Sequence, residues 1–255
     1  MNIFLVKTGI NKKIIIKIGT YAIFDAKKEI LKKNIIKNIT KNISYLLKNE
    51  HEIILVSSGA VGCAKKIISG KNDLGLKQAR SAIGQALLMK TYIKYFSKYK
   101  IPVAQFLITN KDLQEKEGKE NIKNTYEHLK KKAIVIVNEN DVTSIEELKI
   151  GDNDTLASEL LLALDFDKLI ILTEIGALIK NNIPILNSNF YHVKDYDNLN
   201  ISNKGFGGLQ AKLNTAKKIT QNKKECIIAK AEDNIIKILQ NKAPSTTFKY
   251  REELK

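Results

Sequence analysis

Four short apolar runs, each ending in a polar or glycine-rich cluster, restrict this chain to a small set of folds. The runs lie at 14–18, 53–56, 133–137 and 168–173, and β-branched residues are frequent in them. Runs of this length and composition are typical of strands that are buried on both faces. Helical patterns separate the runs, so strand and helix alternate along the chain. This alternation predicts an α/β fold, a three-layer α/β/α sandwich with a mostly parallel open central sheet.

The bounds of one more strand and of the helices can be estimated from the same patterns. The strand is expected from Ile101 to Thr109, with Pro102 at its entry. Since 255 residues can bury a large core, these elements fit one sizeable domain or two tightly joined lobes. Helices are expected from about Lys27 to Lys48, from Lys77 to about Lys98, within 111–132, over Leu156–Leu164, and, after a glycine-rich loop over Gly205–Lys212, to about Asn222.

The strong positive charge does not by itself indicate a nucleic-acid partner. The formal net charge is +16, yet Arg80 and Arg251 are the only arginines among 43 basic residues. Nucleic-acid sites rely on arginine for bidentate contacts to bases and phosphates. The lysines here are spread along the chain, so we expect no nucleic-acid partner.

Neither a membrane nor an oxidising compartment is indicated by the sequence. No apolar stretch approaches the roughly 18 residues that a spanning helix needs, and the run Ile3–Val6 is too short for a signal peptide. Cys63 and Cys226 lack the spacing of metal or redox sites and suit reduced thiols. We therefore expect a cytoplasmic protein whose side chains hold no metal.

Two clusters of Asn and Asp follow strand-like segments near the middle of the chain. Asn138–Asp141 (Asn-Glu-Asn-Asp) comes directly after an apolar run, and Gly151–Thr155 precedes a helical pattern. In an open α/β sheet, ligands bind beyond the carboxyl ends of the strands, so the two clusters predict a site there. The alternative is that these residues only form turns and helix caps.

Three further junctions suggest contacts with anions. Lys17 and Gly19 end the first run, where a lysine can meet phosphate oxygens and a glycine admits close approach. Lys7 is a competitor ten residues earlier, but its apolar run is weaker. Ser57–Gly62 and Gly205–Lys212 each open a helix and expose backbone N–H groups.

Each of the two helix-opening junctions also has a purely structural alternative. For Ser57–Gly62 this is tight packing of a strand against a helix, for which small residues are equally useful. For Gly205–Lys212 it is a flexible surface turn. The latter segment is not a Walker A loop, because its spacing differs and no Ser or Thr follows the lysine.

Taken in order, these segments resemble the amino-acid kinase family. The resemblance extends from about residue 13 to Phe248 and rests on the order and spacing of several motifs. Within the family, the Asn-Glu-Asn-Asp and Gly-Asp-Asn-Asp pair is similar to the branch that phosphorylates glutamate. The motifs are Lys17–Thr20, Val56–Ala60, Lys77-Gln78 with Gly84-Gln85, Asn138–Asp141, Gly151–Asp154, and Gly207-Gly208 with Lys212.

The resemblance implies ATP-dependent phosphorylation of the γ-carboxylate of L-glutamate to glutamyl 5-phosphate, the first step of proline biosynthesis, with Mg²⁺. It implies that Lys17 and Lys212 stabilise the transferring phosphoryl group and that Asp154 orients them. These charges suit a reaction that needs positioning and positive charge more than covalent help. The glutamate site is implied at Ser58, Gly59, Ala60, Asp141 and Asn153, and the nucleotide site at Gly19, Thr173, Glu174, Phe206, Gly207, Gly208, Leu209, Gln210, Ala211 and Lys212.

The family also implies a domain organisation and partners. After an extension of residues 1–12, residues 13–255 form the kinase domain, with an amino-acid-binding half at about 13–165 and a nucleotide-binding half at about 166–250. The PUA domain that many relatives carry is expected to be absent. A homo-oligomer and feedback inhibition by proline are implied as well.

Several residues depart from the usual pattern of the family. Glu174 stands where the family usually has Asp, Phe206 and Ala211 where it has Thr, and Ala64 where it has Gly. The segment after Gly176 also lacks the usual Tyr and Asp-Pro-Arg. Because most departures fall on the nucleotide side, a catalytically weakened, ligand-binding or regulatory protein stays open as an alternative. A second alternative, within the enzymes, is a sibling kinase of the acetylglutamate or carbamate type.

Overall fold

A computed structural model describes residues 12–71, 73–143, 153–180, 183–184, 189–190 and 207–250, with 179–180, 183–184, 189–190 and 207–209 described by their backbone alone. The strands are β1 (Lys13–Ile18), β2 (Phe24–Asp25), β3 (Ile30–Leu31), β4 (Glu52–Val56), β5 (Val103–Ile108), β6 (Ile134–Glu139), β7 (Lys168–Thr173), β8 (Ile179–Lys180), β9 (Ile183–Pro184), β10 (Asn189–Phe190), β11 (Glu225–Lys230) and β12 (Ser245–Phe248). The helices are α1 (Thr20–Ile23), α2 (Lys33–Lys48), α3 (Ala60–Cys63), α4 (Leu74–Phe96), the 3-10 turn η1 (Ser97–Tyr99), α5 (Asn110–Gln114), α6 (Lys116–Leu129), α7 (Asn153–Ala163), α9 (Gly207–Gln221) and α10 (Ile235–Leu239).

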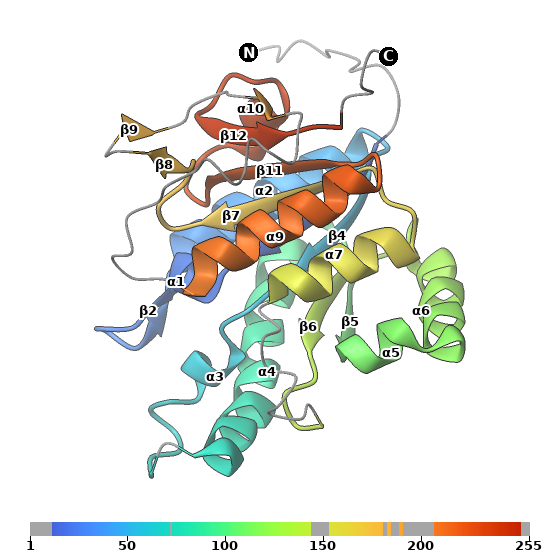
Figure 1. Cartoon of the computed structure of the whole chain (residues 1–255). Coiled ribbons are helices and arrows are strands. Elements are labelled where there is room, and N and C mark those ends of the chain that lie inside the picture. Colours follow the sequence, from blue (N-terminus) through green and yellow to red (C-terminus); the bar gives the residue numbers. More distant parts are fainter. Residues whose placement is uncertain are drawn as a thin grey trace, which may run out of the picture.

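Eight of the strands form one sheet, in the order β10-β12-β11-β7-β1-β4-β6-β5. Neighbouring strands are parallel except β11 and β12, which are antiparallel. Parallel neighbours need long crossover connections, and helices supply most of them here. The expected α/β fold with a mostly parallel central sheet is confirmed (Figure 1).

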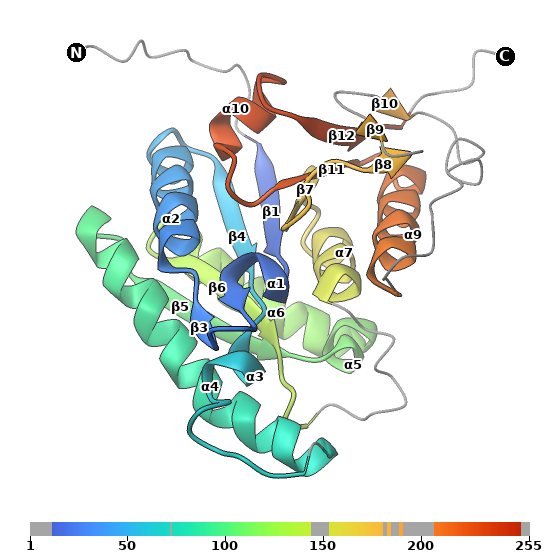
Figure 2. The ribbon, with the colours of Figure 1, turned by 90° about the vertical axis from the view of Figure 1, so that its left-hand side faces the viewer.

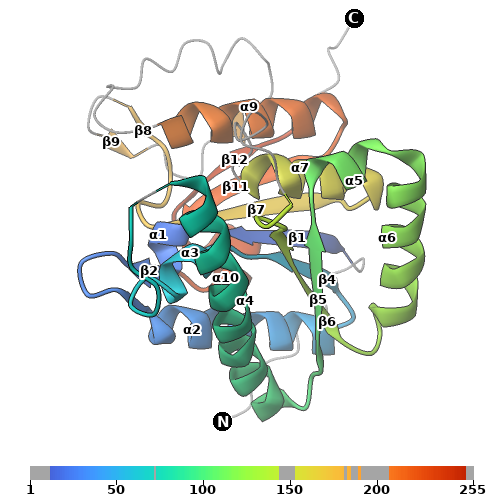
Figure 3. The ribbon, with the colours of Figure 1, turned by 90° about the horizontal axis from the view of Figure 1, so that it is seen from below.

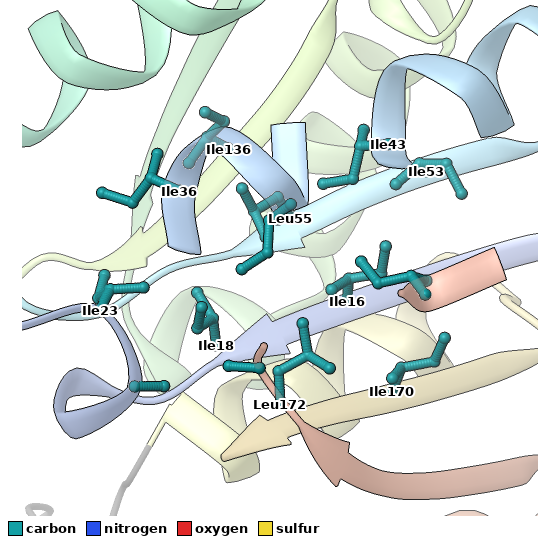
Figure 4. Close-up of a cluster of buried hydrophobic side chains, with 14 of the residues drawn as sticks. Ile16, Ile18, Ile23, Ile36, Ile43, Ile53, Leu55, Ile136, Ile170 and Leu172 are labelled. Carbon is teal, nitrogen blue, oxygen red and sulfur yellow. The ribbon is translucent and has the colours of Figure 1, made fainter. Parts of the chain in front are cut away.

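The strands send alternate side chains into two separate cores, because successive residues of a strand point to opposite faces. On β1, Ile14, Ile16 and Ile18 join the core that α2, α4 and α10 cover. Figure 4 shows part of this core, with Ile16 and Ile18 beside residues of the neighbouring strands and of α2. Ile15 lies in the other core, beneath α7 and α9. Figure 2 shows these helix layers on opposite sides of the sheet, so the structure has three layers.

The period of two also decides where the lysine of β1 goes. Lys17 lies two residues after Ile15 and therefore faces α7 and α9 rather than α2. Its backbone pairs with Val56 on one side and Ile171 on the other. Lys17 is only 2% exposed. Burial of a cation costs free energy unless the cation is paired with an anion.

Two of the expected helices differ from the structure. The helix expected from about Lys27 begins only at Lys33, because the hairpin β2–β3 occupies the preceding residues. Asp25 Oδ1 accepts hydrogen bonds from the backbone N–H groups of Lys27 and Lys28, both at 3.0 Å, which favours a turn over a helix. The expected helical region 111–132 is divided into α5 and α6, since Glu115 between them has an extended backbone.

Other expectations were closer to the structure. The helix expected from Lys77 begins at Leu74, where the side chain of Asp73 accepts a hydrogen bond from Leu76 N at 2.9 Å. The strand expected from Ile101 to Thr109 is confirmed as β5. The expected extension 1–12 lies, except for Lys12, outside the described residues. No helix in the described part of the chain is long and apolar enough to cross a membrane.

Candidate active site

A buried carboxylate joins two lysines from different parts of the chain. Asp154 is fully buried, and its Oδ1 lies 2.6 Å from Lys17 Nζ while its Oδ2 lies 3.1 Å from Lys212 Nζ. Lys17 is the last residue but one of the central strand β1, Asp154 is in the first turn of α7, and Lys212 is in α9. The structure thus brings together the three residues predicted to be catalytic. These three side chains by themselves carry one net positive charge.

Gly19 lies beside the ammonium group of Lys17. A Cβ at residue 19 would lie 3.9 Å from Lys17 Nζ and 3.8 Å from Leu172 O, which is ordinary contact. Gly19 N donates to Leu172 O at 3.2 Å, which holds the residue after β1 beside the end of β7. A bulkier residue would extend into the space beside the lysine.

A pocket of about 210 Å³ lies beyond the carboxyl ends of β1, β4 and β6. It is smaller than the roughly 300–1,000 Å³ of pockets for drug-sized ligands, and therefore suits a small metabolite. All five residues predicted for the glutamate site line it. The lining consists of Thr20, Ser58, Gly59, Ala60, Val61, Gly62, Asn138, Glu139, Asp141 and Asn153.

A network of amide groups holds three walls of the pocket together. Asn153 Nδ2 lies 2.7 Å from Ser58 Oγ, 2.7 Å from Ser57 O and 2.8 Å from Asn138 Oδ1. Asn138 Nδ2 in turn donates to Gln85 Oε1 at 2.9 Å. The ends of β4 and β6 are thereby tied to the start of α7, the helix that carries the buried aspartate.

Asp141 is the acidic side chain predicted to meet an ammonium group, and its Oδ2 accepts a hydrogen bond from Ser81 Oγ at 2.5 Å. The residues after β6 are also held by Gln78, whose Nε2 donates to Val142 O at 3.2 Å. Both donors come from α4. The Asn-Glu-Asn-Asp motif had been recognised in the sequence, but the roles of Asn138 and Ser81 had not.

The start of α3 has the geometry expected of a small-residue junction. Gly59 has φ +94°, in the left-handed region that glycine adopts readily, and it precedes the short helix α3. Gly84 of α4 packs against this junction, because a Cβ at Gly84 would lie 1.8 Å from Ala60 O. Tight packing and a ligand-facing backbone therefore coexist here, as Ala60 both lines the pocket and contacts α4.

Apart from Gly19 after β1, the predicted nucleotide residues that the structure describes lie at the carboxyl end of β7 and in the first turns of α9. Thr173 Oγ1 accepts a hydrogen bond from Gly176 N at 2.8 Å, which closes the turn after β7. Glu174 is largely exposed and pairs with Lys32, whose Nζ lies 2.7 Å from Glu174 Oε1. Lys32 was not predicted, since the ion pair joins residues that are 142 positions apart.

The glycine-rich segment before Lys212 is helical rather than a loop. Gly207, Gly208, Leu209, Gln210 and Ala211 belong to the first turns of α9, and Phe206 lies outside the described residues. The expectation of a loop up to residue 212 was therefore wrong. The start of a helix of 15 residues carries a partial positive charge, and Lys212 lies on its second turn.

The cysteines and His51 have environments that suit structural roles. Burial raises the pKa of Cys63 to about 11, and burial raises the pKa of Cys226 well above its usual value. Burial lowers the pKa of His51, whose Nδ1 accepts a hydrogen bond from Lys12 N at 3.3 Å. Among the residues that the structure describes, no group of three or more His, Cys, Asp or Glu side chains could hold a metal ion.

Comparisons with known proteins agree with this geometry. The model of the amino acid kinase family matches residues 12–230. "Glutamate 5-kinase" of Dictyoglomus turgidum is 37% identical over 255 aligned residues, which cover 95% of this chain and 68% of that protein. The protein of the same name from Dictyoglomus thermophilum is 35% identical, over 93% of this chain and 67% of that protein.

Solved structures show the same fold at low sequence identity. Carbamate kinase from Giardia lamblia bound to AMP-PNP has a TM-score of 0.69 and 17% identity, and the match covers 94% of this chain and 99% of that one. UMP kinase from Ureaplasma parvum has a TM-score of 0.61 and 13% identity, over 94% of this chain and all of that one. These matches concern the arrangement of the elements, not the substrate.

Proposed function

Because the chain belongs to the amino acid kinase family, we propose that it transfers the γ-phosphoryl group of ATP to the γ-carboxylate of L-glutamate. The product is glutamyl 5-phosphate, formed in the first step of proline biosynthesis. The observation that carries the proposal is the buried cluster of Lys17, Asp154 and Lys212, in a chain whose predicted amino-acid pocket includes Asp141. The curated relatives of this chain bear the name of the same activity.

The reaction requires charge and positioning rather than a covalent intermediate on the protein. An oxygen of the γ-carboxylate attacks the γ-phosphorus, an O–P bond forms, and the bond from phosphorus to the bridging oxygen breaks with its electrons leaving on ADP. Negative charge moves through the transferring group, and Lys17 and Lys212 stabilise it as fixed cations. Asp154 keeps both ammonium groups in place, so little reorganisation is needed at the moment of transfer.

The amino-acid end of the substrate is recognised in the pocket. Asp141 forms an ion pair with the α-ammonium group and accepts a hydrogen bond from it, since a carboxylate is the natural partner of a cation. Ser58 and the backbone at Gly59 and Ala60 receive a substrate carboxylate. Asn153 orders the pocket through its contacts with the ends of β4 and β6.

The nucleotide lies on the side of β7 and α9 in this proposal. Thr173, Glu174, Gly19 and the first turns of α9 flank it, and Phe206 belongs to the same set by resemblance alone. The Glu174–Lys32 ion pair would adjoin the nucleotide.

Magnesium fits the site as a companion of the nucleotide. The described residues contain no cluster of three metal-ligating side chains, and both oxygens of Asp154 already lie against lysines. Phosphate oxygens and water are the ligands that Mg²⁺ prefers when a protein offers few carboxylates. When bound, the ion neutralises charge on the phosphates; glutamate, by contrast, is held and oriented by this chain's own residues.

Sibling kinases are less consistent with the pocket. N-acetylglutamate carries an acetamide where glutamate has an ammonium group, and Asp141 would then lose its counter-charge, which is costly in a partly buried position. Carbamate has no α-ammonium group at all. Neither a weakened, ligand-binding homologue nor a nucleic-acid binder is favoured by a particular contact.

Trapping of the acyl phosphate tests the proposal. Hydroxylamine converts glutamyl 5-phosphate into a hydroxamate that gives a coloured complex with iron. We expect a hydroxamate that requires L-glutamate, ATP and Mg²⁺ together, and none with N-acetylglutamate; the Lys17→Met variant serves as the inactive control. A higher rate with N-acetylglutamate would assign the protein to the sibling activity. Binding of glutamate without any hydroxamate would indicate a catalytically weakened homologue.

Further properties follow from the family and stay proposals. We propose a homo-oligomer, feedback inhibition by proline and a location in the cytoplasm. Analytical ultracentrifugation tests the first, and an assay of glutamate phosphorylation with added L-proline tests the second. A monomer, or activity that proline leaves unchanged, would remove the corresponding proposal. The division into halves near residue 165 also stays a prediction, since one sheet contains strands of both parts.

A further inference from the structure

One face of helix α4 is bound to the residues that follow β6. Positions 78, 81 and 85 are spaced i, i+3 and i+7, which places their side chains along one face of the helix. Each makes one hydrogen bond with the end of β6 or the loop after it. The bonds join Gln78 to Val142, Ser81 to Asp141, and Gln85 to Asn138.

The Ser81 bond is the contact that acts on the acidic side chain of the pocket. Ser81 is 4% exposed and does not line the pocket, whereas Asp141 does. The separation of 2.5 Å between Ser81 Oγ and Asp141 Oδ2 is in the range of charge-assisted O–H···O⁻ bonds. Because this bond engages Oδ2, it limits rotation of the carboxylate and leaves Oδ1 as the oxygen for another donor.

The serine sits on a rigid part of the molecule. Gly84, one turn further along α4, packs against Ala60 so closely that a Cβ would lie 1.8 Å from its carbonyl oxygen. Tyr92 Oη lies 2.9 Å from Ser57 Oγ, which fixes the next turns of the helix to the end of β4. Figure 3 shows α4 beside α3, as these contacts require. A donor on such an element holds its partner in one orientation.

We propose that Ser81 is a positioning residue, which holds Asp141 in the orientation that receives the α-ammonium group of the substrate. The inference rests on the proposed function and adds to it a residue that sets the preference for a free amino acid. Ser81 acts through Asp141 alone and touches neither the phosphoryl group nor the buried lysines.

The proposal predicts a specific pattern of kinetic changes. Without the hydroxyl, the carboxylate of Asp141 can rotate away, and the ammonium group loses a preorganised partner. A hydrogen bond to a charged group that is lost in Ser81→Ala should raise the KM for glutamate on the order of tenfold. The KM for ATP and kcat should stay within about twofold, because the phosphoryl-transfer centre is unchanged.

A ligand without the ammonium group separates positioning from general loosening of the pocket. Glutarate has both carboxylates of glutamate and no amine, so its inhibition constant should stay the same in Ser81→Ala. Ser81→Thr keeps a hydroxyl and should restore the KM for glutamate. Ser97→Ala is the matched control, because Ser97 lies just after the same helix and its hydroxyl donates to Lys94 O, at 3.0 Å, far from Asp141 in the sequence.

The experiment is steady-state kinetics of these variants, with thermal melting to compare their folds. A double variant with Asp141→Asn should show no further rise in the KM for glutamate beyond Asp141→Asn itself, since both changes act on one group. An unchanged KM for glutamate in Ser81→Ala, or equal weakening of glutamate and glutarate, would overturn the inference while leaving the proposed function intact. Absence of glutamate-dependent activity in the wild-type protein would overturn the proposed function and this inference with it.

Discussion

Replacing Asp154 by Asn tests the organisation of the phosphoryl-transfer centre. The change keeps the shape of the side chain and removes the one negative charge between Lys17 and Lys212. At an effective dielectric constant of about 20, the two attractions at 2.6 and 3.1 Å amount to about 6 and 5 kcal/mol before desolvation is counted. Loss of one partner from a buried charge pair costs about 3–5 kcal/mol of unfolding free energy.

This cost should be visible in both stability and activity. For a domain of this size, about 3–5 kcal/mol lowers Tm by roughly 6–20 °C. We also expect kcat to fall on the order of 10²-fold, because the two ammonium groups repel each other and are no longer preorganised. The KM values should change less. Thermal unfolding followed by circular dichroism and steady-state kinetics measure the two effects.

Asp165→Asn provides a matched control. Asp165 makes an ion pair of the same 2.6 Å length with Lys224, but its side chain is 82% exposed. Exposed pairs contribute about 0–1 kcal/mol, so this variant should unfold within a few degrees of the wild type. The reasoning is refuted if Asp154→Asn lowers Tm no more than Asp165→Asn does.

Three more predictions concern single residues. Lys17→Met should lower kcat on the order of 10²-fold with a much smaller change in the KM for glutamate, and full activity of this variant would place the catalytic lysine elsewhere. Gly84→Ala should lower the free energy of unfolding by about 1–3 kcal/mol in chemical denaturation, because the new Cβ would lie 1.8 Å from Ala60 O. Gly75→Ala in the same helix should be neutral or stabilising, since the nearest atom to its Cβ would lie at 3.7 Å. Equal effects of the two changes would contradict the packing described. Burial raises the pKa of Cys63 to about 11, so roughly 0.1% of this thiol should be thiolate at pH 8, against roughly 10% for a thiol of pKa 9.0. Iodoacetamide should therefore modify Cys63 about 100-fold more slowly in the native protein than in the urea-unfolded protein. Similar rates would show that the thiol is not buried.

The parts of the fold that follow from periodicity were predictable from the sequence. The apolar runs became β1, β4, β6 and β7, because continuous β-branched segments suit strands covered on both faces. The same logic placed Lys17 near the end of a strand, whereas the central place of that strand in the sheet came from the structure. The helix Lys33–Lys48 was predicted too long, since the bonds of Asp25 to the turn are a local competitor that periodicity does not register.

The site was only partly predictable. Motif order identified five of the ten residues that line the pocket and the three residues of the charge cluster, because those residues are characteristic in type and spacing. Ser81 and Lys32 had no such signal. Each contacts a residue far away in the sequence, and the contact exists only once α4 and the β2–β3 hairpin are packed.

Transfer of an oxygen isotope from substrate to phosphate tests the central claim most directly. Glutamyl 5-phosphate cyclises when its amine attacks the carbonyl carbon, and the released phosphate keeps the oxygen through which it was attached. With both oxygens of the γ-carboxylate of glutamate labelled by ¹⁸O, wild-type protein, ATP and Mg²⁺ should yield inorganic phosphate that carries one ¹⁸O atom, as mass spectrometry will detect. Phosphate without the label would show that water, not the γ-carboxylate, had attacked ATP, and would contradict the account.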